Sequence, residues 1–88
     1  MKVLLMKEII TTLNKTPIGS NCLICNIDSS LPIKGRLNEL GFSNGSVIDK
    51  LQVGSFGSPI ACRVCGAVIA IRSEDADKIF VKDHYRKI

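Results

Sequence analysis

Residues 60–72 read IACRVCGAVIAIR, and this stretch carries the clearest secondary-structure signal in the chain. Ile60, Cys62 and Val64 occupy every second position. A period of two is typical of a β-strand that buries one face. Gly66 interrupts the alternation, and the apolar residues after it resume as another strand. The stretch therefore predicts two consecutive short strands.

Three more short strands are expected, at residues 22–27, 47–53 and 79–81. The second of them follows the turn signal Asn44-Gly45. Its inward face is left open by the sequence, because Asp49 interrupts one alternation and Lys50 interrupts the other.

A short helix is expected after residue 30. Ser30 is placed to cap it, Pro32 lies in its first turn, and Gly41 ends it. Leu37 and Leu40 fall three residues apart, so both are expected to face the core.

A second helix is expected as a single turn through residues 74–76, capped by Ser73. The N-terminal segment is left undecided between helix and strand. Apolar residues recur there at helical spacing, although Ile9 to Thr12 favour a strand equally well. The spaced residues are Val3, Met6, Ile10 and Leu13.

Together these elements predict a mainly β protein, a small barrel of about five strands with one or two short helices. No expected helix is long enough for a βαβ crossover, which argues against a parallel sheet. Against a soft prior of about 150 residues per domain, the 88 residues are expected to form one domain over 1–88. With 45% hydrophobic and 23% charged residues, the composition excludes disordered, collagen-like and coiled-coil chains.

The net charge is +4, from twelve Lys and Arg against eight Asp and Glu. The basic residues are spread over both halves of the chain and the RNA-binding aromatic signature is missing, so no nucleic-acid partner is expected. The apolar run at residues 3–6 is too short for a signal peptide, and nothing approaches the ~18 apolar residues of a membrane span. We expect a cytoplasmic protein without direct membrane insertion.

Three motifs follow one another in a specific order: RLNELGF at residues 36–42, FGSP at 56–59 and AIR at 70–72. Other matching positions lie between and around them. With these motifs the chain resembles the FeoA family, ferrous iron transport protein A, over about residues 12–82. The other matching positions are Gly19, Ile24, Ile27, Asn44, Gly45, Ile48, Ile60, Gly66, Ala76 and residues 79–81.

The resemblance implies a small SH3-like β-barrel in the cytosol. It also implies a partner, a membrane ferrous-iron transporter that carries its own GTPase domain. The same barrel forms the C-terminal domain of iron- and manganese-dependent repressors that resemble the diphtheria toxin repressor, whose helix-turn-helix and dimerisation segments this chain lacks. Ser58 departs from the family by replacing an acidic residue, Ile71 by replacing leucine, and Gly35 by replacing a basic residue.

Phe56 and Arg36 are the candidate partner-binding residues. Phe56 lies in a glycine-containing loop, where an aromatic side chain either pins the loop to the barrel or anchors another protein. Arg36 lies on the first expected helix, where it either contacts a partner or is simply solvated.

Four cysteines form two CxxC pairs, Cys22 with Cys25 and Cys62 with Cys65. They are candidate ligands of a divalent transition metal, iron or zinc, because four thiolates make a closed structural site. They are alternatively buried packing residues or a redox pair. Residues i and i+3 of a strand point to opposite faces, which favours packing. His84 is a further candidate ligand or an ordinary tail residue.

The sequence contains no phosphate-binding loop, no Ser-His-acid set and no HExxH, so the chain is not expected to be an enzyme. We expect an accessory protein of ferrous iron uptake that docks on the transporter and modulates it. The alternative is a free-standing metal-binding or metal-sensing module related to the repressor barrel, with the thiols as its ligands.

Overall fold

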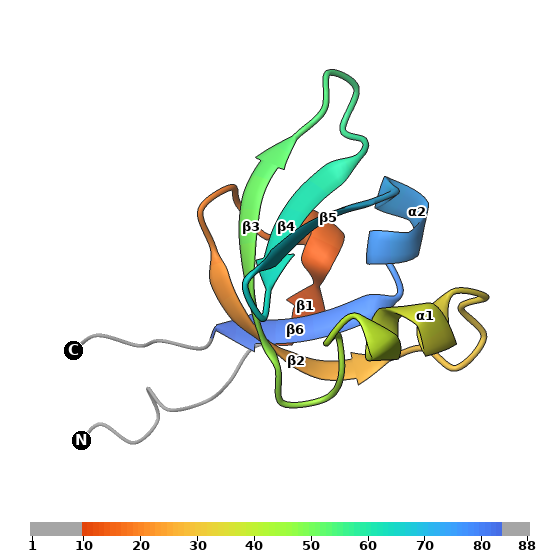
Figure 1. Cartoon of the computed structure of the whole chain (residues 1–88). Helices are drawn as coiled ribbons and strands as arrows, with labels where there is room; N and C mark the ends of the chain where they lie inside the picture. The colour runs from red at the N-terminus through yellow and green to blue at the C-terminus, as the bar shows by residue number, and fades with distance from the viewer. Residues whose placement is uncertain (1–9, 84–88) are drawn as a thin grey trace, which may run out of the picture.

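Six antiparallel strands form a single sheet in the order β1-β6-β2-β3-β4-β5 in the computed structural model, which describes residues 10–83 (Figure 1). The strands are β1 (Thr11–Thr12), β2 (Asn21–Ile27), β3 (Val47–Val53), β4 (Ile60–Val64), β5 (Ala67–Ile71) and β6 (Ile79–Asp83). The expected mainly β class is confirmed, and the five expected strands are all present. The additional strand, β1, is two residues long and pairs with β6.

The sheet curls around the core, with β5 crossing in front of β3 and β4 (Figure 1). Register shifts between Ile24 and Asn26 on β2, and between Lys50 and Gln52 on β3, give the strands the local bends that such curling needs. The core is a single cluster of buried apolar side chains. It comprises Leu13, Cys22, Ile24, Ile27, Leu31, Leu37, Phe42, Ile48, Ile60, Cys62, Val64, Ile71, Ala76, Ile79 and Val81.

The undecided face of β3 is settled by Ile48 and Lys50, which both point inward. Lys50 is only 3% exposed although it carries a charge. Asp49, between them, faces outward, where Asn21 donates a hydrogen bond to it. The strand therefore buries the cation and exposes the anion.

Helix α1 (Lys34–Glu39) starts later than expected. The predicted capping role of Ser30 is wrong, because the Ser30 N–H donates to Asp28 Oδ1 at 2.9 Å in a turn before the helix. Pro32 also precedes the helix, whose N-cap residue is Ile33 and makes no side-chain cap.

Gly41 terminates α1, as predicted. Gly41 has φ +103°, the Phe42 N–H donates to Leu37 O at 2.8 Å, and the Gly41 N–H donates to Asn38 O at 3.1 Å. This is a Schellman motif, in which Leu37 and Phe42 are both buried. The predicted core position of Leu40 is wrong, since Leu40 is 38% exposed and Phe42 supplies the buried side chain instead.

The undecided N-terminal segment is β1 followed by the 3-10 helix η2 (Leu13–Lys15). Val3 and Met6 lie outside the described residues. Helix α2 (Ser73–Ala76) forms as expected, but its N-cap residue is Arg72 and not Ser73. Within residues 10–83, no helix is both long and apolar enough to cross a membrane.

Candidate functional site

The loop between β3 and β4 projects away from the body of the molecule (Figure 1). The Gly54 N–H donates to Pro59 O at 2.9 Å and the Gly57 N–H donates to Gly54 O at 2.9 Å, so the loop is braced by its own backbone. Gly54 is required there, because a Cβ at this position would lie 2.2 Å from Ser58 O. The loop is a narrow, internally bonded projection.

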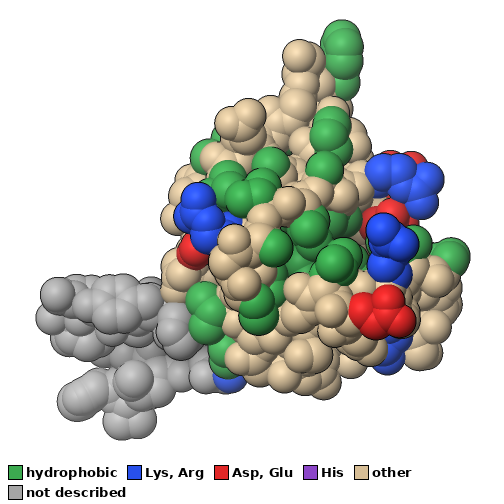
Figure 2. Space-filling view, viewed as in Figure 1, with side chains coloured by type: hydrophobic (Ala, Val, Ile, Leu, Met, Phe, Trp, Pro, Cys, Tyr) green, Lys and Arg blue, Asp and Glu red, His purple; other side chains and the backbone are tan. Residues whose placement is uncertain are grey.

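Phe56 is 99% exposed on this loop. Figure 2 shows hydrophobic atoms at the far tip of the projection. Phe56 therefore does not pin the loop to the barrel, which removes one of its two interpretations. A fully exposed phenylalanine on a braced loop presents a large apolar surface to a partner at little cost in entropy.

Arg36 lies on the exposed side of α1, one residue before the buried Leu37. The Schellman motif and the packing of Leu37 fix the helix against the barrel. Helix α1 and the β3–β4 loop lie at opposite ends of the molecule in Figure 1. The structure therefore does not bring Arg36 and Phe56 into one site.

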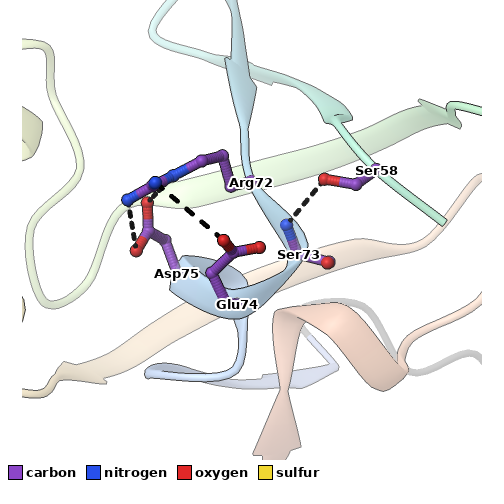
Figure 3. Close-up of polar contacts among 5 residues, drawn as sticks. All are labelled: Ser58, Arg72, Ser73, Glu74 and Asp75. Carbon is purple, nitrogen blue, oxygen red and sulfur yellow. Dashed lines mark hydrogen bonds and ion pairs between the residues drawn. The ribbon is translucent and has the colours of Figure 1, made fainter.

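A polar cluster joins the end of β5 to the β3–β4 loop (Figure 3). The Ser73 N–H donates to Ser58 Oγ at 3.1 Å, so the loop serine satisfies the first backbone donor of α2. Arg72 donates to both carboxylate oxygens of Asp75, from Nε at 3.0 Å and from Nη2 at 3.3 Å. Glu74 Oε2 lies 3.9 Å from Arg72 Nη1.

This geometry holds Arg72 in a fixed orientation while most of its side chain stays in solvent. The hydrogen bond from Arg72 to Asp75, followed by the charge of that carboxylate, raises the pKa of the guanidinium. Arg72 was not among the predicted site residues, although the AIR motif contained it.

The four cysteines do not gather at one place. Cys22 and Cys62 are fully buried core residues, Cys25 is half-buried, and Cys65 is exposed in the turn after β4. Among residues 10–83, no group of three or more His, Cys, Asp or Glu side chains is placed to hold a metal ion. His84 lies outside these residues, so its predicted role stays a prediction.

The positions of the thiols follow from the strands. Cys22 is paired with Ile48 and Cys62 with Lys50, so the two lie on the strands that flank β3. Burial raises the pKa of the Cys62 thiol to about 11, against the opposing effect of the Lys50 ammonium. Cys65 has φ +52°, and its Sγ is close enough to Gly41 that a Cβ there would lie 2.8 Å away.

Lys50 is a second residue that the sequence did not single out. Its Nζ donates to three backbone carbonyls at the end of η2, namely Leu13 O and Asn14 O at 3.1 Å and Thr16 O at 2.5 Å. Burial lowers the pKa of Lys50. The signal was present as a lysine that interrupts the apolar alternation of β3. These hydrogen bonds tie β3 to the segment around η2.

Several solved structures are similar to this chain. The chain is similar to a FeoA-like protein from Clostridium acetobutylicum at 23% identity, with 94% of this chain and 95% of that chain covered and a TM-score of 0.79. It is similar to Stenotrophomonas maltophilia FeoA, an SH3 domain protein solved in complex with zinc, at 25% identity, 81% and 88% coverage and a TM-score of 0.70.

The chain is also similar to a manganese-dependent transcriptional repressor at 19% identity, a likeness of fold alone that covers 88% of this chain and 43% of the repressor, with a TM-score of 0.77. No curated protein matches. The small SH3-like fold implied by the sequence motifs is confirmed by these structures. The family model of the FeoA domain matches residues 11–83, from β1 to the end of β6, and the chain therefore belongs to the FeoA domain family.

Proposed function

We propose that this protein is a non-catalytic, cytoplasmic accessory protein of ferrous iron transport that docks on the cytosolic part of the membrane transporter. The FeoA domain match over residues 11–83 supports the link to iron transport. The similar protein from Stenotrophomonas maltophilia is described as a candidate activating factor of bacterial ferrous iron transport. The repressor likeness concerns the fold alone and carries no second proposal.

The observation that carries the docking proposal is the complete exposure of Phe56. Water contact of a phenylalanine side chain is costly, and burying it in a partner's pocket contributes about 1.5–3 kcal/mol. The two backbone hydrogen bonds across the loop reduce the entropy lost on binding. Phe56 is thus suited to be the anchor of an interface.

The test measures binding of the full chain to the detergent-solubilised transporter of the same organism, with and without guanine nucleotide and Fe²⁺. Phe56→Ala is expected to weaken binding about 10- to 100-fold, because about 1.5–3 kcal/mol of burial is lost. Phe56→Leu should restore part of the affinity. Ser55→Ala, on the neighbouring exposed residue, is the matched control and should bind as the wild type does.

Two results would count against the proposal. Absence of wild-type binding under every condition would remove docking altogether. Equal binding of wild type and Phe56→Ala would leave docking in place but would exclude Phe56 as its anchor.

A further inference from the structure

Strand β5 forms one edge of the sheet and pairs only with β4 among the described strands. Its five residues, Ala67–Ile71, are all apolar. Edge strands are normally guarded against further pairing by a lysine, a proline or a bulge. β5 has none of these, and its register with β4 runs without a shift from Ile71 to Ala67.

The hairpin geometry shows which backbone groups of β5 are available. Cys65 and Gly66 both have positive φ, +52° and +82°, as a two-residue type I′ turn requires. Such a turn closes on a hydrogen-bonded pair, here Val64 with Ala67, and along the ladder the bonded pairs alternate. Val68 and Ala70 therefore direct their N–H and C=O groups away from β4.

No other segment within residues 10–83 reaches those four backbone groups with a hydrogen bond. The side chains beside them are also uncovered. Val68 is 58% exposed, and Ala67 and Ala70 are exposed as well. Figure 2 shows hydrophobic side chains across the middle of the face that β5 crosses, with both basic and acidic side chains on each side of them.

We propose that the β5 edge binds an extended segment of another protein as an added strand, and that this segment is apolar with an acidic residue. Val68 and Ala70 each exchange two backbone hydrogen bonds with it, the arrangement known as β-augmentation. The inference rests on the proposed docking function, since the segment belongs to the same transporter. It names a second contact surface, distinct from the Phe56 loop.

The acidic character of the segment follows from charge. Arg63 is exposed on β4 directly opposite Val68, so its guanidinium lies one strand away from the added segment. Arg72 follows the other end of β5, but Asp75 and Glu74 already lie against its guanidinium. Arg63 is therefore the cation that a carboxylate on the added strand meets.

A second copy of this chain is a poorer occupant of the edge. Each copy carries a net charge of +4, so two copies repel each other. Pairing of β5 with itself engages five residues from each copy, whereas a stable interface engages about 20–30 residues a side. A segment of the transporter avoids both difficulties, because its acidic residue is attracted to this chain and the Phe56 loop adds to the contact area.

The binding assay with the detergent-solubilised transporter, applied to three variants, tests the added strand. Ala70→Pro removes the N–H that faces the partner while the ladder to β4 is kept, because proline is tolerated where an edge N–H faces solvent. Val68→Glu places a carboxylate beside the acidic residue of the added segment, and like charges on paired strands are destabilising. Ile10→Glu is the matched control, since Ile10 is 57% exposed against 58% for Val68 and precedes β1 at the opposite edge.

We expect Ala70→Pro and Val68→Glu each to weaken binding at least about tenfold, the loss that corresponds to about 1.4 kcal/mol, and Ile10→Glu to bind as the wild type does. Circular dichroism checks that each variant is folded. If Ala70→Pro does not fold, Val68→Glu decides, because it changes only an exposed side chain.

The other outcomes overturn the inference in distinguishable ways. Equal binding of all variants means that docking stands and the β5 edge plays no part in it. Absence of wild-type binding removes both this inference and the proposed function. A wild-type dimer in sedimentation equilibrium that Val68→Glu dissociates means that the edge binds a second copy.

Discussion

At the scale of single residues, the charged pair Asp49 and Lys50 decides which side of β3 enters the core. Both interrupt an apolar alternation, and sequence patterning has no means of choosing between two charges. Which of the two side chains is buried depends on the groups that face β3 from the neighbouring segment. The end of η2 offers carbonyl oxygens that an ammonium can satisfy and a carboxylate cannot, so the lysine is buried.

Replacement of Lys50 by methionine tests this account. The variant keeps a long apolar side chain but leaves the carbonyls of Leu13, Asn14 and Thr16 without their donor in a site that excludes water. We expect a loss of about 2–4 kcal/mol in the free energy of unfolding, measured by urea denaturation. Lys15→Met, on an exposed residue of η2, should change it by less than about 0.5 kcal/mol. An unchanged midpoint of urea unfolding for Lys50→Met would contradict a stabilising role of Lys50.

At the scale of elements, α1 shows that a helix end can be more predictable than its start. The end is set by Gly41, whose positive φ is a local property of the residue type. The start is set by the turn in which Asp28 accepts the Ser30 N–H, and that turn competes with the cap expected at Ser30. A capping side chain alone does not reveal which of two local hydrogen bonds forms.

Two glycines of this region make a matched pair for mutation. Gly41→Ala forces a side chain into φ +103° and brings its Cβ to 2.8 Å from Cys65 Sγ, so we expect a loss of about 1–3 kcal/mol. Gly35→Ala lies inside α1 with nothing within 4 Å of the added Cβ, and should gain about 0.5–1 kcal/mol from helix propensity. Thermal unfolding of both variants measures the effects. A shift of the melting temperature in the same direction for both variants would contradict the different roles given to the two glycines.

For the whole molecule, the strands could be predicted because alternation is local, as in Ile60, Cys62 and Val64. The contact surfaces could not, because exposure depends on the assembled sheet. Phe56 could have packed back on the barrel, and only the loop geometry shows that it does not. Likewise, the apolar composition of residues 67–71 fits a buried strand as well as an edge, and the strand order decides between them.

The reactivity of the cysteines measures whether the sheet is closed. Cys22 on β2 and Cys62 on β4 flank the central β3, so both thiols reach solvent only when the sheet opens. Cys65 is exposed in a turn and reacts without unfolding. The pKa of about 11 at Cys62 further slows its reaction near pH 7, because the thiolate is the reactive form.

We therefore expect a thiol reagent to label Cys65 at least about a thousand times faster than Cys22 and Cys62, a ratio set by the few kcal/mol that unfolding requires. Mass spectrometry of the labelled chain identifies each site, and labelling in guanidinium gives the unfolded reference. Addition of zinc should leave the rate at Cys65 unchanged. If zinc instead protects all four thiols together, they form one metal site, and the strands that separate them here must rearrange to build it.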